Sequence, residues 1–439
     1  GLGYTMKGSG STSYSYQNYT FTGKPNNNII KRAITLNNDA LVGNPYPSAL
    51  NAYEFIKDNI PLLDPDGSAS AANSGTTGSI DGSLYFWIHF DSNNTHVLRE
   101  YQGGYAIYTL SGGVAPVEGL KYTTTDGFEI SGGGNSSLRP GQYIPVAQGF
   151  FVHSADDNKI KNELKFQNSQ RAFQRETNDN SSDGSQFLKS NNSKDAKSSS
   201  NPPIDETAIK RLRLQFKTPE GARRHLLLAF TPDNSASDGF DYGYDAKVFE
   251  NLPNDMLFTI NNEKYVIQGV GAFDETKQYP FGLYSKTGGD IEISVTELEN
   301  LDPNTKVYVY DALLGTYTKI NDKNSKFETT LDPGDYLNRY FITFKKDMLL
   351  DVPDENLELI LVNYLQDSKE IFIKTPDRID VKQVYLINIL GQSIKSWNAT
   401  NTASFSHEFK IPVQNVSNGS YIIKVETSIG TMNKKIIIK

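Results

Sequence analysis

The sequence predicts an all-β protein made of tandem β-sandwich domains, of the immunoglobulin-like or jelly-roll-like kind. Tyrosine and phenylalanine are abundant, with 25 and 23 residues among 439. Aromatic residues favour strands. Short apolar runs bounded by turn residues recur along the chain, while the 3.6-residue period of amphipathic helices is nearly absent. A chain of this length has room for several such domains.

Charge and cysteine content argue against several classes of function. The net charge is -8, the pI is about 5.3 and no basic stripe is visible, so nucleic acid is not an expected partner. The chain has no cysteine, which excludes disulfides, thiolate metal sites and cysteine nucleophiles. No apolar run is long enough for a transmembrane segment. The chain begins with Gly1 and shows no signal peptide, so we expect the carboxy-terminal part of a longer protein.

Residues 1–173 are predicted to form the first β-sandwich, which we interpret as a surface module. Its expected strands lie at Leu84–Phe90, Gly103–Tyr108 and Pro140–Val152. Two prolines flank Tyr46 and impose an extended path there. Ser48 is expected to cap a short helix over residues 49–57.

Residues 174–206 are predicted to form a flexible polar linker or loop, because they are too poor in apolar residues to bury a core. Residues 207–347 are predicted to form a second β-sandwich. Polar and apolar residues alternate strictly over Arg211–Phe216, and after a turn at Gly221 the chain returns as His225–Phe230. Further strands are expected at Lys264–Gln268, Ile291–Val295, Lys306–Tyr310 and Tyr340–Phe344.

Residues 348–439 are predicted to form a third, smaller β-sandwich that ends on a strand. Gly391 supplies the conformational freedom of a tight hairpin between two apolar runs. Asn418-Gly419 and Gly430 mark two further turns. The last strand carries three lysines among isoleucines: Lys434, Lys435 and Lys439. Either these lysines protect a sheet edge against mispairing, or the terminal strand is an address that another protein reads.

The order of these elements resembles the type A C-terminal sorting domain of the type IX secretion system. Val384, Asn388, Gly391 and Gln392 match its first hairpin; Gly419 and Tyr421 match its Gly-x-Tyr strand; Lys434, Lys435 and Ile436–Ile438 match its basic and apolar final strand. Two mild departures exist. Val416 stands where leucine is commoner, and the hairpin has Asn388 and Gln392 where aspartate and lysine are commoner.

The resemblance implies a cargo protein of Bacteroidetes that crosses the outer membrane and reaches the cell surface or the medium. The implied partners are an outer-membrane translocon, a shuttle β-barrel and a signal peptidase that removes the carboxy-terminal domain. The implied sorting signal comprises Asn388, Gly391, Gln392, Gly419, Tyr421, Lys434, Lys435 and Lys439. The upstream regions resemble modules of flavobacterial surface proteins, so we expect a non-catalytic stalk or adhesin, in the setting of adhesion or gliding.

The search for reactive side chains gives weaker signals. The metalloprotease helix, the nucleophile elbow and the phosphate-binding loop are all absent from the sequence, so we expect no enzyme activity and no cofactor. Asp238, Asp241 and Asp245 offer the oxygen ligands that Ca²⁺ prefers. Aspartates are also the usual residues of turns, where they bond backbone groups. Both interpretations, a weak calcium site and a fixed loop, stay open at this point.

The alternative function is an extracellular protein that binds or degrades polysaccharides and carries the same sorting domain. Tyrosine and tryptophan faces stack on sugars, and five tyrosines are candidates for contact with surface glycans: Tyr14, Tyr16, Tyr19, Tyr101 and Tyr105. Aromatic residues of short strands also pack against each other across strands. An enzyme of this class needs a carboxylate pair in a cleft, which a sequence does not reveal.

Overall fold

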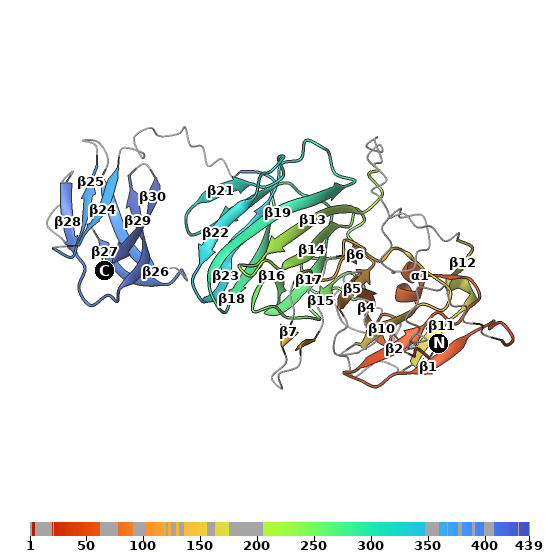
Figure 1. Cartoon of the computed structure of the whole chain (residues 1–439). Helices are drawn as coiled ribbons and strands as arrows, with labels where there is room; N and C mark the ends of the chain where they lie inside the picture. The colour runs from red at the N-terminus through yellow and green to blue at the C-terminus, as the bar shows by residue number, and fades with distance from the viewer. Residues whose placement is uncertain are drawn as a thin grey trace. The chain divides into compact units, whose positions relative to one another are not determined.

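The computed structural model confirms the prediction of an all-β protein. It describes residues 2–4, 20, 22–61, 78–90, 102–119, 122–123, 129–130, 136–155, 163–174, 205–346, 360–366, 368–375, 380–388, 391–398, 408–428 and 430–438. Within these residues, helix is limited to α1 (Ala52–Lys57) and the 3₁₀ turn η2 (Asn168–Gln170). Every other regular element is a strand (Figure 1).

The chain divides into two compact units. Unit 1 comprises Gly1–Asp274, Ser285–Thr305 and Ile320–Asp332. Unit 2 comprises Glu275–Tyr284, Lys306–Lys319 and Pro333–Lys439. Unit 1 therefore contains residues from both sides of the segment 174–206, while the domain boundaries expected from the sequence stay predictions.

The first part of unit 1 is built around a five-stranded antiparallel sheet. Its order is β2 (Asp39–Gly43), β10 (Gly149–Ser154), β4 (Ile80–His89), β5 (Gly103–Thr109) and β6 (Gly112–Val114). Smaller sheets pair β1 (Ile30–Ala33) with β11 (Glu163–Phe166), β7 (Tyr122–Thr123) with β8 (Glu129–Ile130), and β3 (Ala49–Asn51) with both β12 (Arg171–Ala172) and β9 (Tyr143–Ile144). Phe55 of α1 packs on Phe150 and Phe166, so the helix covers the core of this part.

The helix begins later than the sequence suggested. Ala49 to Asn51 continue as strand β3, and the side chain of Asn51 accepts hydrogen bonds from the backbone of Tyr53 and Glu54. Asn51 is therefore the N-cap in place of Ser48, whose carbonyl instead accepts a bond of 2.8 Å from the Asn44 side chain. Strand pairing with β9 and β12 holds this segment extended and overrides the local capping preference.

The second part of unit 1 is a larger group of neighbouring strands. Its order is β16 (Asn254–Ile260), β17 (Glu263–Val270), β14 (Arg223–Phe230), β13 (Lys210–Lys217), β19 (Gly289–Glu299) and β22 (Phe327–Leu331), with β15 (Ala246–Lys247) beside β17. β13 and β14 form the hairpin that the alternating pattern predicted. β14 and β17 run parallel to each other. Leu212, Leu214 and Phe216 of β13 are fully buried on one face.

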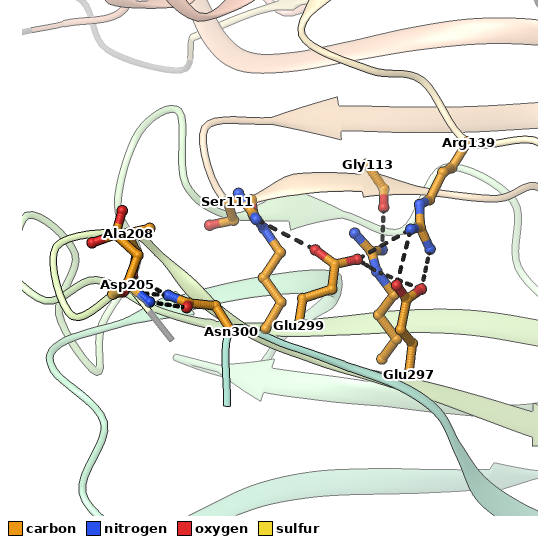
Figure 2. A network of polar contacts seen from close by, with 10 residues as sticks. Ser111, Gly113, Arg139, Asp205, Ala208, Glu297, Glu299 and Asn300 are labelled. Atoms are coloured by element: carbon orange, nitrogen blue, oxygen red, sulfur yellow. Dashed lines mark hydrogen bonds and ion pairs between the residues drawn. The ribbon is translucent and has the colours of Figure 1, made fainter. Parts of the chain in front are cut away.

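On its other face, β13 is joined to the first part of unit 1 by an arginine clamp, which we define as Arg139, Arg211, Arg213, Glu297 and Glu299. Arg139 reaches Glu297 at 2.6 Å and Glu299 at 3.1 Å. Glu299 also pairs with Arg213 and, at 3.4 Å, with Arg211 (Figure 2). Burial alone raises the pKa of Glu299, but the charges of the three arginines hold it below its usual value.

The clamp also bonds the backbone of the β5–β6 hairpin. Arg211 Nε donates to the carbonyl of Ser111 at 2.5 Å, and Arg213 Nη1 donates to the carbonyl of Gly113 at 2.5 Å (Figure 2). Gly112 lies between them with a φ of 132°, and a Cβ there would stand 2.9 Å from Arg211 Nε. The hairpin can approach the arginines this closely because Gly112 has no side chain.

Unit 2 contains a group of neighbouring strands and a terminal sandwich. The group runs in the order β21 (Thr316–Lys319), β20 (Tyr308–Asp311), β23 (Gly334–Thr343) and β18 (Gln278–Ser285). In it, buried Asp311 accepts hydrogen bonds from Arg339 at 3.0 and 2.7 Å. The terminal sandwich has one sheet of β24 (Leu361–Leu365), β25 (Glu370–Lys374) and β28 (Glu408–Pro412), and another of β27 (Ser393–Asn398), β26 (Val381–Asn388), β29 (Gly419–Thr427) and β30 (Thr431–Ile438).

Candidate functional site

The terminal sandwich is a domain with its own apolar core. Buried residues of both sheets meet in one cluster, among them Ile371 and Ile373 of β25 and Ile423 and Val425 of β29. This core follows from the period-two pattern of each strand, which sends alternate side chains inwards. The domain therefore presents its turns and edges from a rigid support.

The first predicted element, the hairpin between β26 and β27, is fixed by a set of short hydrogen bonds. The side chain of Asn388 accepts a bond from the Gln392 backbone at 2.9 Å and donates to the Gln392 side chain at 2.8 Å. Gly391 has a φ of 86°, which only glycine adopts without strain. The structure thus brings Asn388, Gly391 and Gln392 together, and their contacts fix the shape of the turn.

The second predicted element is the start of β29. The hydroxyl of Tyr421 donates to the carbonyl of Ser417 at 2.9 Å, and so ties the turn that precedes Gly419 to the strand. A tyrosine bonded back to a turn a few residues upstream fixes a corner of a β-sandwich in the same way. The sequence did not single out Ser417, because the acceptor is a backbone carbonyl and carries no residue signature.

The third predicted element is β30, which among the described strands pairs with β29 alone and lies at the edge of its sheet. Ile436 and Ile438 are buried, whereas Ile437 is 55% exposed. Lys434 and Lys435 are exposed, and neither ammonium group forms an ion pair within the described part of the chain. By contrast, Lys424 pairs with Glu426 at 2.8 Å. Lys439 lies outside the described residues.

These elements converge at one end of the four-stranded sheet. Asn388 of β26 is opposite Tyr421 of β29, and Tyr421 is opposite Ile436 of β30. Gly419 is in turn opposite Ile438. Motif residues that are far apart in the sequence therefore form one cross-strand row, with Lys434 and Lys435 one step along the edge. Strand register creates this juxtaposition, and register is not visible in a motif.

The other predicted ligands, Asp238, Asp241 and Asp245, lie in one turn, which we call the aspartate loop. Asp245 is buried and accepts backbone hydrogen bonds from Asp241 at 2.6 Å and from Gly269 at 2.7 Å. Asp241 accepts bonds from the backbone and hydroxyl of Ser237. Burial raises the pKa of Asp245 well above its usual value.

The hydrogen bonds of the aspartate loop are those that the fixed-loop interpretation expects, and the calcium interpretation stays a prediction. The carboxylate oxygens of two of its members already face N–H or O–H donors. Among the described residues, no three His, Cys, Asp or Glu side chains are grouped so that they could hold a metal ion.

The five candidate tyrosines have different outcomes. Tyr14, Tyr16, Tyr19 and Tyr101 lie outside the described residues. Tyr105 is half-buried on β5 and contacts three other aromatic rings. In the part of the chain that the structure covers, no helix has the length and apolarity needed to cross a membrane.

Comparison with known families covers most of the chain. The family described as Domain of unknown function (DUF8693) matches residues 1–344. The family described as Secretion system C-terminal sorting domain matches residues 367–439. No curated protein matches the chain. The second match confirms the type IX sorting signal at the carboxy terminus, and such a signal implies export across the outer membrane to the cell surface or the extracellular space.

Proposed function

The chain belongs to the family described as Domain of unknown function (DUF8693), and we propose that it is a type IX cargo whose upstream part is a non-catalytic stalk or adhesin. The sorting domain would act as a conformational address, which a translocon and a shuttle barrel of the type IX machinery read. A peptidase would then remove the address at the cell surface. In this proposal the product works outside the cell by adhesion, without a cofactor.

One observation carries the proposal for the address. Asn388, Tyr421 and Ile436 form one cross-strand row, beside two lysines of an edge strand that have no acidic partner within the described residues. An exposed edge offers unpaired backbone groups to another strand. Exposed unpaired ammonium groups attract an acidic partner at little desolvation cost. The cross-strand row and the lysine edge thus offer a partner protein both a defined shape and positive charge.

Two pairs of residues support a non-catalytic upstream part. His153 lies 2.8 Å from Asp39 of the neighbouring strand, and His225 lies 3.2 Å from Glu118. Both contacts join segments of unit 1 that are distant in sequence, so they can serve as cross-links of the fold. The aspartate loop is likewise occupied by backbone donors.

The test of the proposal is secretion of the full chain, preceded by an export signal, from a bacterium with type IX machinery. Replacing both Lys434 and Lys435 by alanine removes two exposed charges and leaves the core of the sandwich intact. We expect the variant to accumulate in the periplasm. The matched control replaces Lys374 and Lys424, which are paired with Glu408 and Glu426, and we expect normal export. Equal export of both variants would rule out the lysine edge as the address.

A further inference from the structure

Unit 1 has a patch of four aromatic rings outside the sorting domain, which we call the aromatic patch: Trp87, Tyr105, Phe151 and Phe249. The centroid of Tyr105 lies 5.1 Å from Trp87, 5.9 Å from Phe151 and 4.8 Å from Phe249, each at a steep angle. All four side chains are half-buried, so the rings pack together and still reach the surface.

The patch is a property of the five-stranded sheet. Trp87 of β4 is directly opposite Tyr105 of β5, and Phe151 of β10 is opposite Tyr85, so these side chains share one face. A Cβ on Gly103 would stand 2.5 Å from the Trp87 ring. The absence of a side chain at Gly103 leaves the space that the indole occupies.

A small pocket opens beside the patch. Tyr105 and Phe249 form its aromatic wall, and Arg224, His225 and Glu250 provide its polar groups. Its free volume is about 10 Å³, which is room for one water molecule. A sugar ring does not fit inside this space, but a single hydroxyl group does. Gly104 lies close behind this wall, because a Cβ there would stand 2.8 Å from the side chain of Pro116.

The charges of the pocket are largely satisfied by the protein. Arg224 forms a bidentate pair with buried Asp255 at 2.6 and 2.7 Å, and His225 faces Glu118. Burial raises the pKa of Glu250, although the charge of Arg224 opposes this effect. The carboxyl group of Glu250 already accepts a hydrogen bond from the Tyr105 backbone and has room for one more with a hydroxyl group.

We propose that the aromatic patch and its pocket bind one pyranose unit of a neutral polysaccharide. The apolar face of the sugar stacks on the rings around Tyr105, and one hydroxyl enters the pocket and bonds Glu250 or His225. Concave sites that combine aromatic walls with a few fixed polar groups are typical of small-ligand recognition. This inference names the ligand class of the proposed adhesin, and so it rests on the upstream part being exposed outside the cell.

The choice of a neutral polysaccharide over an anionic one follows from the charges near the pocket. The chain carries a net charge of -8. Burial has the largest effect in raising the pKa of Tyr105, and the nearby carboxylates of Glu250 and Asp39 raise it further, so negative charge lies beside the patch. Arg224, the cation that lines the pocket, is already paired with Asp255. An anionic polysaccharide would meet like charge at this site.

The chain contains a built-in reporter for this test. Its two tryptophans are Trp87 in the aromatic patch and Trp397 in the sorting domain. In the full chain with Trp397→Phe, fluorescence comes from Trp87 alone. The probes are laminarin, galactomannan and xyloglucan, which are neutral, and alginate, which is anionic. We expect a saturable change in Trp87 emission with at least one neutral probe and none with alginate.

Volume-conserving variants show whether the rings carry the binding. Tyr105→Leu and Phe151→Leu each remove an aromatic face and keep the core filled, and each should weaken binding at least about tenfold. The control Tyr317→Leu, in the β20–β21 hairpin of unit 2, should bind as the parent does. Urea unfolding of each variant identifies any that fails to fold. If one ring variant does not fold, binding by the other ring variant tests the proposal.

The proposal is overturned if none of the three neutral probes changes Trp87 emission, or if both ring variants bind as tightly as the parent. Binding of alginate with equal strength would overturn the neutral class. Since binding is measured on purified protein, its failure is separate from a failure of secretion.

Discussion

Removal of the Glu299 charge is the sharpest perturbation of the fold of unit 1. Glu299→Gln keeps the shape of the side chain and leaves Arg213, whose side chain is 9% exposed, without its nearest carboxylate. Losing one partner of a buried pair costs about 3–5 kcal/mol. Glu299 is 22% exposed and Glu297 remains 3.7 Å from Arg213, so we expect about 2–3 kcal/mol, below that range.

Urea unfolding in the Trp397→Phe background measures this loss, because Trp87 then reports on unit 1 alone. If the free energy of unfolding falls by about 3 kcal/mol per molar urea, the urea concentration at the unfolding midpoint should fall by roughly 0.7–1 M. The matched control is Glu328→Gln, which removes the exposed partner of Lys326 and should leave the midpoint nearly unchanged, because solvent screens exposed ion pairs. Equal midpoints for the two variants would refute the view that the arginine clamp holds the parts of unit 1 together.

Three further predictions concern acid, the buried pair of unit 2 and the first hairpin. The pKa of Glu299 is lower in the folded protein than in the unfolded chain. The ionised Glu299 therefore stabilises the fold above its unfolded pKa, and this stabilisation is lost as the pH falls through the folded pKa. Urea midpoints measured from pH 5 down to pH 3 should consequently fall less steeply in Glu299→Gln than in the parent. Asp311→Ala removes the buried carboxylate that pairs with the largely buried Arg339 and should cost about 3–5 kcal/mol, seen as a lower calorimetric transition temperature, while an unchanged temperature would contradict the pairing. Gly391→Val forces a β-branched residue to a φ of 86° and should destabilise the terminal sandwich by about 1–2 kcal/mol. Urea unfolding followed by Trp397 fluorescence, in a Trp87→Phe background, measures this loss. Unchanged stability would show that the turn relaxes without cost.

Period-two patterning made the strands readable from sequence. The alternation over 211–216 predicted β13, and the return at 225–230 predicted β14, because one face of each strand is buried and side-chain direction has a fixed period. The sorting motif was readable for a related reason. Its glycines and tyrosine mark turn geometries that few other residues adopt.

Features that depend on contacts between distant segments of the chain could not be predicted from the sequence. The parallel contact of β14 with β17 and the clamp between Arg139 and Glu297 join segments whose sequences do not signal each other. The same holds for the aspartate loop, where the donor of Gly269 decides that Asp245 faces backbone groups. Local rules also yielded to sheet pairing at Ala49–Asn51, which stay extended as β3.

The central claim, that the terminal sandwich is the export address, is tested most directly by transplanting it. The sandwich has its own core, so residues 348–439 can be fused to an export signal and a fluorescent protein. A second fusion lacks the last eight residues and with them most of β30. We predict that the complete fusion reaches the cell surface or the medium and that the truncated one stays in the periplasm. Retention of both fusions, or export of both, would contradict the account.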